Sequence, residues 1–385
     1  MSIIIGADLV PTESNLDLFV SGNISSLIGF ELEEKLKNAS YRIFNMEVPL
    51  TDIEEPIIKR GPNLRAPSKA IVGYKKLGVD LVTLSNNHIL DQGVKGAQDT
   101  ISLLDNAGIS YVGYGNDIKS AARPHIFECY GKCIGVYACA EHEFSVAGEN
   151  TSGANPFDPL FSLDHIETLK KSVDFVIVLY HGGKELYRYP SPMLQRVCRR
   201  MIDKGADLIV CQHSHCIGCE ERYRNRTIVY GQGNVLFDRC NDECWQTSLL
   251  IEIDDSFRIS YIPITKCGNG VRIADEKSAK EIMNNFIIRS EQIKDGAFLQ
   301  ISYDDFAKRS LYYYLAQVKG KERIIFKIIN KISNNKVRIS SIKRKYDKDH
   351  IASLWNFIVC EAHSELFSRG LQLNINDPYE NESDM

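Results

Sequence analysis

Short apolar segments that alternate with amphipathic helical segments constrain the fold of this chain most strongly. Strands that alternate with helices predict a layered α/β architecture with a largely parallel sheet. The last two strands are expected to be antiparallel and joined by a hairpin at residues 254–256. We expect helices at residues 93–107 and 192–204, and strands at residues 2–7, 41–46, 81–84, 109–112, 133–138, 174–180, 207–211, 227–230, 248–253 and 258–263.

A change in composition near residue 270 predicts a division into domains. Of the 26 glycines, 23 lie at or before Gly270, and so do 11 of the 12 prolines. We therefore expect an α/β domain at residues 1–268, a helical appendage at residues 275–375 and a flexible acidic tail at residues 376–385. In the appendage we expect a basic loop at residues 334–345, and helices at residues 276–285, 303–318, 322–332 and 350–369.

The composition is that of an ordinary globular protein, with 44% hydrophobic and 25% charged residues, which excludes a disordered or coiled-coil chain. No apolar run approaches the ~18–20 residues that span a bilayer. Residues 1–10 lack a basic region typical of a secretory signal, so we expect a cytoplasmic protein with reduced thiols. The formal net charge of −4 gives no reason to expect nucleic acid as the main partner.

Polar side chains follow five of the expected strands at the point where each strand ends. In open α/β sheets the carboxyl ends of parallel strands meet at one edge, where sites form. These side chains are therefore expected to converge, although they lie far apart in the sequence. They are Asp8, Glu47, Asn87 with His88, His181, and the pair His213 and His215.

Two carboxylates, an asparagine carbonyl and three histidines form a mixed oxygen and nitrogen ligand set. Such a set suits Mn²⁺, Zn²⁺ or Fe²⁺. Six ligands are too many for one catalytic zinc ion, but they suit two ions that share a carboxylate and activate a water as hydroxide. For any one residue alone, a helix cap or another satisfied polar group is the more common role, as at Asn86–His88. The convergence of five segments favours a metal site.

His88 remains outside this ligand set. It would be free to act as a general acid or to stabilise charge, and Asp91, one helical turn later, could orient its ring. We assign both residues to the catalytic group.

The order and spacing of these blocks resemble the CapA-type capsule (poly-γ-glutamate) synthesis proteins of the calcineurin-like metallophosphoesterase superfamily. The resemblance covers roughly residues 2–265 and implies a sandwich of two sheets flanked by helices. The segments that carry it are GAD (6–8), NMEVPLT (45–51), NNHILDQG (86–93), GISYVGYG (108–115), YHGGKE (180–185), GADLIVCQHSH (205–215) and YGQGNVLFD (230–238).

The resemblance also implies individual roles at the two ions. Asp8 and His215 would bind the first ion, Glu47 would bridge, and Asn87, His181 and His213 would hold the second. His88 matches the catalytic histidine that follows the asparagine ligand. Two positions depart from the superfamily pattern. Val10 stands where Asp-x-His motifs place a ligand, and Glu47 stands where most phosphoesterases use Asp. The first site therefore has fewer ligands and is expected to be weak, or to take Mg²⁺ or Mn²⁺ more readily than zinc.

Several further residues are candidates for contacts around the ions. Cations and aromatic rings beside a metal suit a carboxylate or phosphate substrate, although a solvated loop explains the same residues equally well. The pair His142–Glu143 could also line the cleft or cap a turn. We expect Asn234 and Asp238 to lie beneath the ions, and we assign the substrate to Arg65, Lys184, Glu185 and Tyr187.

Two other features leave alternatives open. The spacings of Cys216, Cys219, Cys240 and Cys244 are tolerable for a structural zinc ion, but dispersed free thiols are the more common case. Between Lys319 and Lys348 the chain carries eleven bases and two acids, which suit an acidic partner, a polyanion or simply a solvated helix face.

Three functions are compatible with these patterns. The first is a metal-dependent hydrolase that cleaves a phosphoester or an acidic capsule polymer of the poly-γ-glutamate type by metal-activated hydroxide. The second is a non-catalytic accessory factor that binds an anionic polymer during its biosynthesis. The third is a phosphodiesterase that acts on nucleic acid through the basic appendage.

Overall fold

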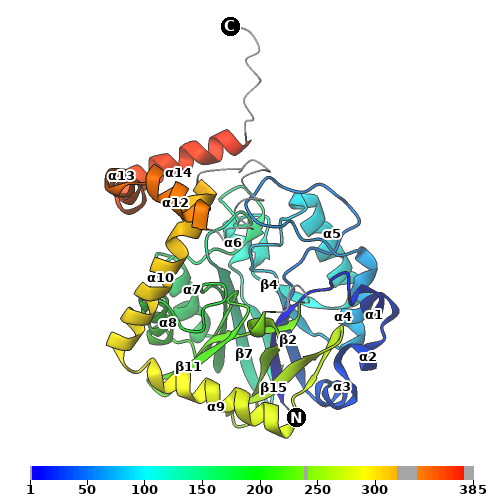
Figure 1. Ribbon diagram of the computed structural model, residues 1–385. Helices are drawn as coiled ribbons and strands as arrows, with labels where there is room; N and C mark the ends of the chain where they lie inside the picture. The colour runs from blue at the N-terminus through cyan, green and yellow to red at the C-terminus, as the bar shows by residue number, and fades with distance from the viewer. Residues whose placement is uncertain (1, 238–241, 319–335, 377–385) are drawn as a thin grey trace. The chain divides into compact units, whose positions relative to one another are not determined.

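The computed structural model describes residues 2–237, 242–318 and 336–376. The chain divides into two compact units, Met1–Gln300 and Ile301–Met385. The first unit contains two large β-sheets and most of the helices (Figure 1). Residues 377–385 of the acidic tail predicted at 376–385, and the predicted helix at 322–332, lie outside the described residues.

The first sheet is parallel in the half that carries the N-terminal strand. Strands β1 to β4 run parallel to one another, and β14 to β16 extend the sheet antiparallel on the other side of β1. In spatial order the strands are β16 (Gly270–Ile273), β15 (Ile259–Cys267), β14 (Thr247–Ile253), β1 (Ile3–Leu9), β2 (Tyr41–Asn45), β3 (Leu81–Thr83) and β4 (Ser110–Val112), and β13 (Asn234–Leu236) pairs with β1.

The second sheet has a parallel centre and antiparallel edges. In spatial order its strands are β11 (Ile217–Tyr223), β12 (Arg226–Gln232), β10 (Leu208–Gln212), β9 (Phe175–His181), β7 (Lys132–Ala140) and β6 (His125–Cys129). The strands β7, β9, β10 and β12 are parallel, and β6 and β11 run against them. A small ribbon is formed by β5 (Tyr114–Gly115) and β8 (Gly153–Ala154).

The central strands are buried on both faces, because successive side chains of a strand point to opposite sides. On β1, Ile3 and Ile5 pack between the sheets against Ile177 and Leu179 of β9. Ile4 packs instead against the helices that cover the outer face of the first sheet. The architecture is therefore the two-sheet sandwich flanked by helices that the resemblance implies.

Helices cover the outer faces of both sheets. On the first sheet these are α1 (Leu16–Ser21), α2 (Ile24–Ile28), α3 (Phe30–Lys37), α4 (Ile71–Lys76) and α5 (Gly93–Ala107), and on the second they are α7 (Ser162–Lys170) and α8 (Pro192–Asp203). Shorter helical segments are α6 (Ile118–Ala121) and the 3-10 turns η1 (Ser68–Ala70) and η2 (Glu243–Trp245).

All ten predicted strand segments form strands, and the predicted hairpin joins β14 to β15. The strands that the sequence did not reveal are β5, β6, β8, β11, β13 and β16. β6 lies at a sheet edge, where its side chains are only partly buried, and the sequence there lacks a continuous apolar run. β5, β8, β13 and β16 have at most four residues each, which is too short for a periodic pattern.

The helix α9 (Glu276–Gln292) belongs to the first unit, so the division falls after residue 300 rather than at residues 268–275. Asp275 caps this helix by accepting a hydrogen bond from the backbone N–H of Ser278 at 2.9 Å. Its buried residues Ile282 and Phe286 pack with Ile217 and Leu249 of the two sheets. This apolar contact joins the helix to the sandwich.

The second unit is helical in its described part. It contains most of α10 (Gly296–Val318), followed by α12 (Lys336–Lys345), α13 (Lys348–Val359) and α14 (Glu361–Asn376). The expectation of a basic loop at 334–345 was wrong for residues 336–345, because Ile342 and Tyr346 lie one turn apart and bury against Leu315. The helix expected at 350–369 is interrupted at Cys360. Within the described ranges, no helix is both long and apolar enough to span a bilayer.

Candidate metal centre

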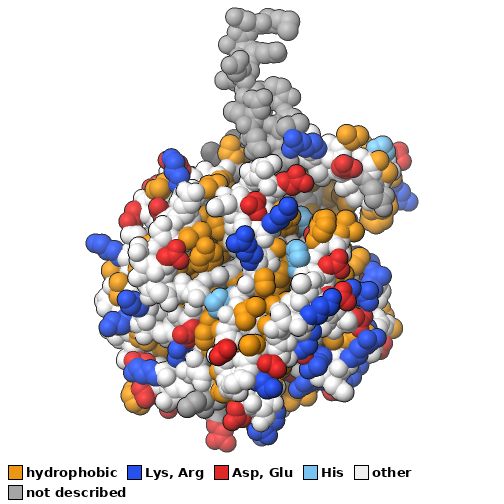
Figure 2. All heavy atoms as spheres, turned by 180° about the vertical axis from the view of Figure 1, so that it is seen from behind, with side chains coloured by type: hydrophobic (Ala, Val, Ile, Leu, Met, Phe, Trp, Pro, Cys, Tyr) orange, Lys and Arg blue, Asp and Glu red, His pale blue; other side chains and the backbone are white. Residues whose placement is uncertain are grey.

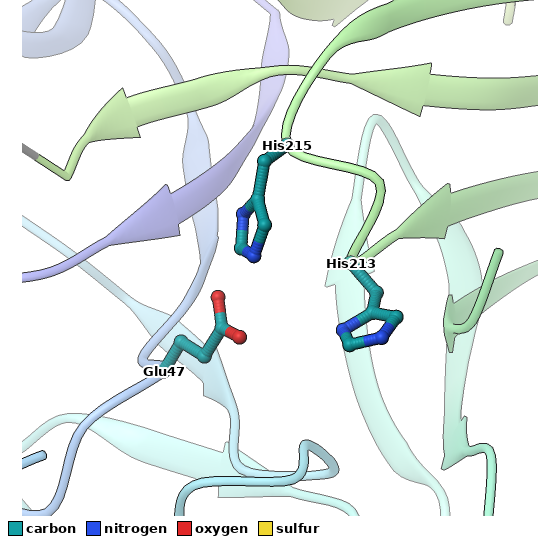
Figure 3. A group of neighbouring side chains, drawn as sticks. All are labelled: Glu47, His213 and His215. Carbon is teal, nitrogen blue, oxygen red and sulfur yellow. The ribbon is translucent and has the colours of Figure 1, made fainter. Parts of the chain in front are cut away.

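The six predicted ligands come together where the parallel strands of both sheets end. Asp8 lies on β1 and His181 ends β9, whereas the others lie in turns that follow β2, β3 and β10. Figure 3 shows the carboxylate of Glu47 directed toward the space between the imidazoles of His213 and His215. Because the two sheets face each other, ligands from both reach the same space.

One group of ligand atoms surrounds Nε2 of His181. This atom lies 3.1 Å from Oδ1 of Asn87, 3.1 Å from Nδ1 of His213 and 3.4 Å from Oε1 of Glu47. Two ligands that bind one ion at ~2.1 Å, with an angle of about 90–110° between them, are about 3.0–3.4 Å apart. Each of these three atoms therefore lies at the distance from Nε2 of His181 that is expected between two ligands of one ion.

A second group contains Asp8 and His215. Oδ2 of Asp8 lies 3.1 Å from Nδ1 of His215. The ligand atoms of Asp8, Glu47 and His181 all lie within 4.8 Å of one another, as do those of Glu47, His213 and His215. Each set combines residues that the resemblance assigns to different ions, and Glu47 is the carboxylate common to both sets, which is compatible with a bridging role.

The Glu47 carboxylate is fully buried, and within the described part of the chain neither of its oxygens has a hydrogen-bond partner. A buried carboxylate without partners is strongly disfavoured, because it has lost its hydration and nothing replaces it. Burial accordingly raises the pKa of Glu47 well above its ordinary value, and the charge of Asp8 raises it further. A divalent ion would supply the missing partner, so the residues fit a metal.

Two of the histidines are held neutral, as metal ligands must be. Burial lowers the pKa of His181 to about 4 and that of His213 well below its ordinary value. His215 differs. Burial would lower its pKa, but the charge of Glu47 and the hydrogen bond that the ring donates to Asp8 outweigh burial and raise the pKa to about 10. An ion that binds His215 therefore displaces a proton.

The turn after β10 is strained so that both of its histidines face the site. His213 and His215 adopt left-handed backbone conformations, with φ of 79° and 53°. Residues other than glycine rarely adopt such angles, and those that do cluster at functional sites. Trp245 stacks on the His215 ring with centroids 4.8 Å apart, and Asn234 contacts its Nδ1 at 2.9 Å. Both contacts fix the orientation of the imidazole.

His88 lies beside the ligands but outside the two groups. Its Nδ1 is 2.5 Å from Oδ2 of Asp91, and its Nε2 is 4.0 Å from Oε1 of Glu47. Burial lowers the pKa of His88, while the hydrogen bond with Asp91 opposes this effect. The ring therefore has one nitrogen held by a carboxylate and the other directed toward the metal ligands.

The predicted substrate residues are placed differently from one another. Lys184 lies near the ligands, because its charge contributes to lowering the pKa of His213, and it pairs with Glu141 at 3.6 Å. Glu185 is exposed, and its charge contributes to the raised pKa of Glu47. Tyr187 is buried against Tyr189, with ring centroids 5.8 Å apart. Arg65 is exposed and pairs with Glu54 at 3.3 Å.

The remaining predictions concern Asp238 and the cysteines. Asp238 and Cys240 lie outside the described residues. Cys216 and Cys219 are buried and Cys244 is half-buried. A hydrogen bond from Cys244 lowers the pKa of Cys216, whereas burial raises that of Cys219. Among the described residues no group with the spacing of metal ligands includes a cysteine.

Sequence analysis did not identify three residues that support the ligands. Asn45 donates a hydrogen bond from Nδ2 to Oδ1 of Asp8 at 2.6 Å, and Trp245 forms the stacking contact described above. The third is Lys59, which contacts Asp91. Asn45 ends β2 two residues before Glu47, which was a usable signal. Glu143, one of two residues expected in the cleft or in a turn, accepts a hydrogen bond from Nδ2 of Asn87 at 3.2 Å.

Comparisons with known proteins identify relatives of this chain. The family model of the bacterial capsule synthesis protein PGA_cap matches residues 26–239. The capsule biosynthesis protein CapA of Bacillus anthracis is 30% identical over 214 residues, which are 53% of this chain and 52% of CapA. A probable polyglutamine synthesis accessory protein of Mycobacterium tuberculosis is 26% identical over 209 residues, which are 51% of this chain and 55% of that protein.

The chain thus spans about half the length of the curated relatives that it matches. Among solved structures, a phosphatase from Mycoplasma pneumoniae aligns with 74% of this chain and 98% of its own, at 14% identity and a TM-score of 0.43. The family model covers more than half of the 385 residues and five of the six predicted ligands. The chain belongs to the bacterial capsule synthesis protein PGA_cap family.

Proposed function

We propose that this protein is a metal-dependent hydrolase that acts on a phosphoester during the biosynthesis of an acidic capsule-type polymer. The observation that carries the proposal is the buried Glu47 carboxylate, which lacks hydrogen-bond partners and is shared by two groups of ligand atoms. A purely structural site would satisfy such a group with hydrogen-bond donors.

In this proposal Asn87, His181, His213 and Glu47 hold one divalent ion, and Asp8, His215 and Glu47 hold the other. The mixed oxygen and nitrogen donors suit Mn²⁺, Zn²⁺ or Fe²⁺ and also admit Mg²⁺ at the oxygen-rich first site. A bound pair of ions would supply Lewis acidity and neutralise charge at a phosphorus centre.

The chain's own residues then provide proton transfer and orientation. His88 would exchange a proton at Nε2 with an oxygen of the substrate, since its Nδ1 is held by Asp91. Lys184 lies close enough to influence His213 and would attract an anionic substrate to the ligands. The acidic residues Glu185 and Glu143 border the same region. We therefore assign the attraction of an anionic substrate to Lys184 and not to an extended basic surface.

The names of the relatives supply the biological context of the proposal. They refer to capsule biosynthesis and to polyglutamine synthesis, and the M. tuberculosis relative is described as an accessory protein. We infer that the substrate is linked to an acidic polymer of this kind. In a variant of the proposal the substrate is a poly-γ-glutamate-type linkage itself, and bound ions would supply Lewis acidity at a carbonyl instead of at phosphorus.

A second candidate is an accessory factor that binds an anionic polymer without cleaving it. Val10 favours this candidate, because it is buried in the apolar core where Asp-x-His motifs place a metal ligand. The first ion would then have few protein ligands. A site with one well-held ion can still bind anionic groups of a polymer.

The nucleic-acid alternative has less support. On the face shown in Figure 2, basic and acidic side chains are interspersed and do not form a continuous basic surface. Binding to a polynucleotide would have to weaken steeply with salt, with a slope set by the number of phosphates contacted. If the appendage carries the binding to a polynucleotide, deletion of residues 301–385 should remove this salt-dependent binding.

Incubation of the metal-loaded protein with model substrates tests the proposal. We expect hydrolysis of bis-p-nitrophenyl phosphate that requires added Mn²⁺ and stops with EDTA, and no comparable release of glutamate from poly-γ-glutamate. Cleavage of poly-γ-glutamate alone would transfer the proposal to the polymer linkage. If neither compound reacts with Mn²⁺, Zn²⁺, Fe²⁺ or Mg²⁺ while poly-γ-glutamate binds, the accessory role replaces the enzymatic one.

A further inference from the structure

A buried lysine lies behind His88 in a long irregular segment between β2 and η1. The side chain of Lys59 is 3% exposed, whereas its neighbour Ile58 is 72% exposed and Arg60 is also exposed. An ammonium group is rarely buried unless it is paired, because it loses its hydration. The chain therefore turns an apolar side chain outward at this point and a charged one inward.

The partners of Lys59 all belong to the turn that carries Asn87 and His88. Nζ forms an ion pair with Oδ1 of Asp91 and lies 3.4 Å from the carbonyl oxygen of Asn87 and 3.2 Å from Nδ1 of His88. The other Asp91 oxygen, Oδ2, contacts Nδ1 of His88 at 2.5 Å and accepts a hydrogen bond from the backbone N–H of Leu64 at 2.5 Å. Lys59 thus pairs with Oδ1 of Asp91, while the imidazole of His88 contacts Oδ2.

This arrangement fixes which nitrogen of His88 carries hydrogen. Nδ1 lies between Asp91, which can only accept, and the Lys59 ammonium, which can only donate. The carboxylate is the closer partner, so Nδ1 donates to Asp91 and Nε2 faces Glu47. Asp91 keeps this geometry because the Lys59 ammonium and the backbone N–H of Leu64 both donate hydrogen bonds to its carboxylate.

We propose that Lys59 is a positioning residue of the reaction, which holds Asp91 so that the imidazole of His88 presents Nε2 to the substrate. The inference rests on the proposed function, since it acts through His88. It deepens that function by adding a third member to the His88–Asp91 pair. It requires no contact between Lys59 and the substrate, since Nζ already pairs with Asp91 and contacts the carbonyl oxygen of Asn87.

Replacement of Lys59 by Met tests the proposal, because Met retains the length of the side chain and removes the charge. With bis-p-nitrophenyl phosphate and Mn²⁺ we expect kcat to fall by ~10–100-fold. KM and the metal content per chain should stay within about twofold. Lys59→Arg, which keeps a positive charge, should lose less. Lys95→Met is the matched control, because Lys95 is an exposed lysine on α5 that pairs with Glu55, and its kcat should be unchanged.

A double-mutant cycle identifies the route of the effect. If Lys59 acts through His88, Lys59→Met should lower kcat no further in a protein that already carries His88→Ala. An equal loss in both backgrounds, or an unchanged kcat in Lys59→Met alone, would overturn the proposal while leaving the hydrolase function intact.

The ring nitrogens of His88 give a readout that does not depend on turnover. In ¹⁵N-histidine-labelled full-length protein, assigned with His88→Ala, we expect Nδ1 of His88 to show the signal of a protonated ring nitrogen. Lys59→Met should shift or split that signal. If the wild-type protein hydrolyses nothing, the proposed function fails and this spectrum alone decides on Lys59: superimposable His88 signals would refute its positioning role.

Discussion

Replacing Glu47 by Gln is expected to abolish metal binding and, in the absence of metal, to stabilise the protein or leave its stability unchanged. The two effects have opposite directions because Glu47 is a buried carboxylate without hydrogen-bond partners among the described residues. In the metal-free protein its buried charge destabilises the folded state, so a neutral amide of the same shape should raise the free energy of unfolding or leave it unchanged. In the proposed metal-bound protein the same charge would be the shared ligand of both ions.

Thermal unfolding with and without Mn²⁺ measures both effects. At a free metal concentration of 100 times Kd, the wild-type protein gains about 2.7 kcal/mol of stability, and EDTA removes this gain. Glu47→Gln should show no change of Tm on addition of Mn²⁺ up to millimolar concentration. Its Tm in EDTA should equal or exceed that of the wild-type protein.

Glu55→Gln is the matched control, because Glu55 is an exposed glutamate that pairs with Lys95 on the surface. It should keep the full response to Mn²⁺. If Glu47→Gln also keeps that response, or if it loses several degrees of Tm in EDTA, Glu47 has a structural role and the bridging assignment is wrong.

His88→Ala is expected to lower kcat by ~10²–10⁴-fold and to leave the metal content unchanged, which is the range for loss of a general acid or base. Metal content should persist because Nε2 of His88 lies 4.0 Å from Oε1 of Glu47, farther than any of the ligand pairs around His181. Steady-state kinetics with bis-p-nitrophenyl phosphate and metal analysis of the same samples provide the measurement.

His350→Ala is the control for His88→Ala, since His350 is an exposed histidine in α13 that pairs only with nearby Asp347 in the described contacts. It should keep the wild-type kcat. A loss of metal in His88→Ala would assign His88 to the ligands. A kcat within threefold of the wild type would remove it from the reaction.

The convergence of the candidate ligands could be predicted from the sequence because each lies at or just after the end of a recognisable apolar strand. The position of Asp8, His181 or His213 relative to its strand determines which edge of the sheet it reaches. The strand register also places Asn45 beside Asp8, and the hydrogen bond between them depends on the pairing of two separate strands. The sequence therefore indicated where the site lies more reliably than which side chains support it.

Lys59 and Trp245 could not be predicted, because their roles depend on the path of irregular segments. Lys59 lies among exposed residues, and nothing in its local sequence indicates that its side chain turns inward. Trp245 follows a segment without regular periodicity and meets His215 only through the tertiary fold. The boundary of the α/β unit was placed too early for a similar reason, since only the packing of Phe286 shows that α9 belongs to the sheets.

Crystals grown with Mn²⁺ and measured at the manganese absorption edge test the central claim most directly. We expect anomalous density at two positions about 3.5–4 Å apart, with Glu47 between them and His181, His213 and His215 as ligands. Density at one position, among Asn87, His181, His213 and Glu47, would retain the metal centre and favour the accessory role. Saturating Mn²⁺ with no anomalous density beside Glu47 would contradict the account.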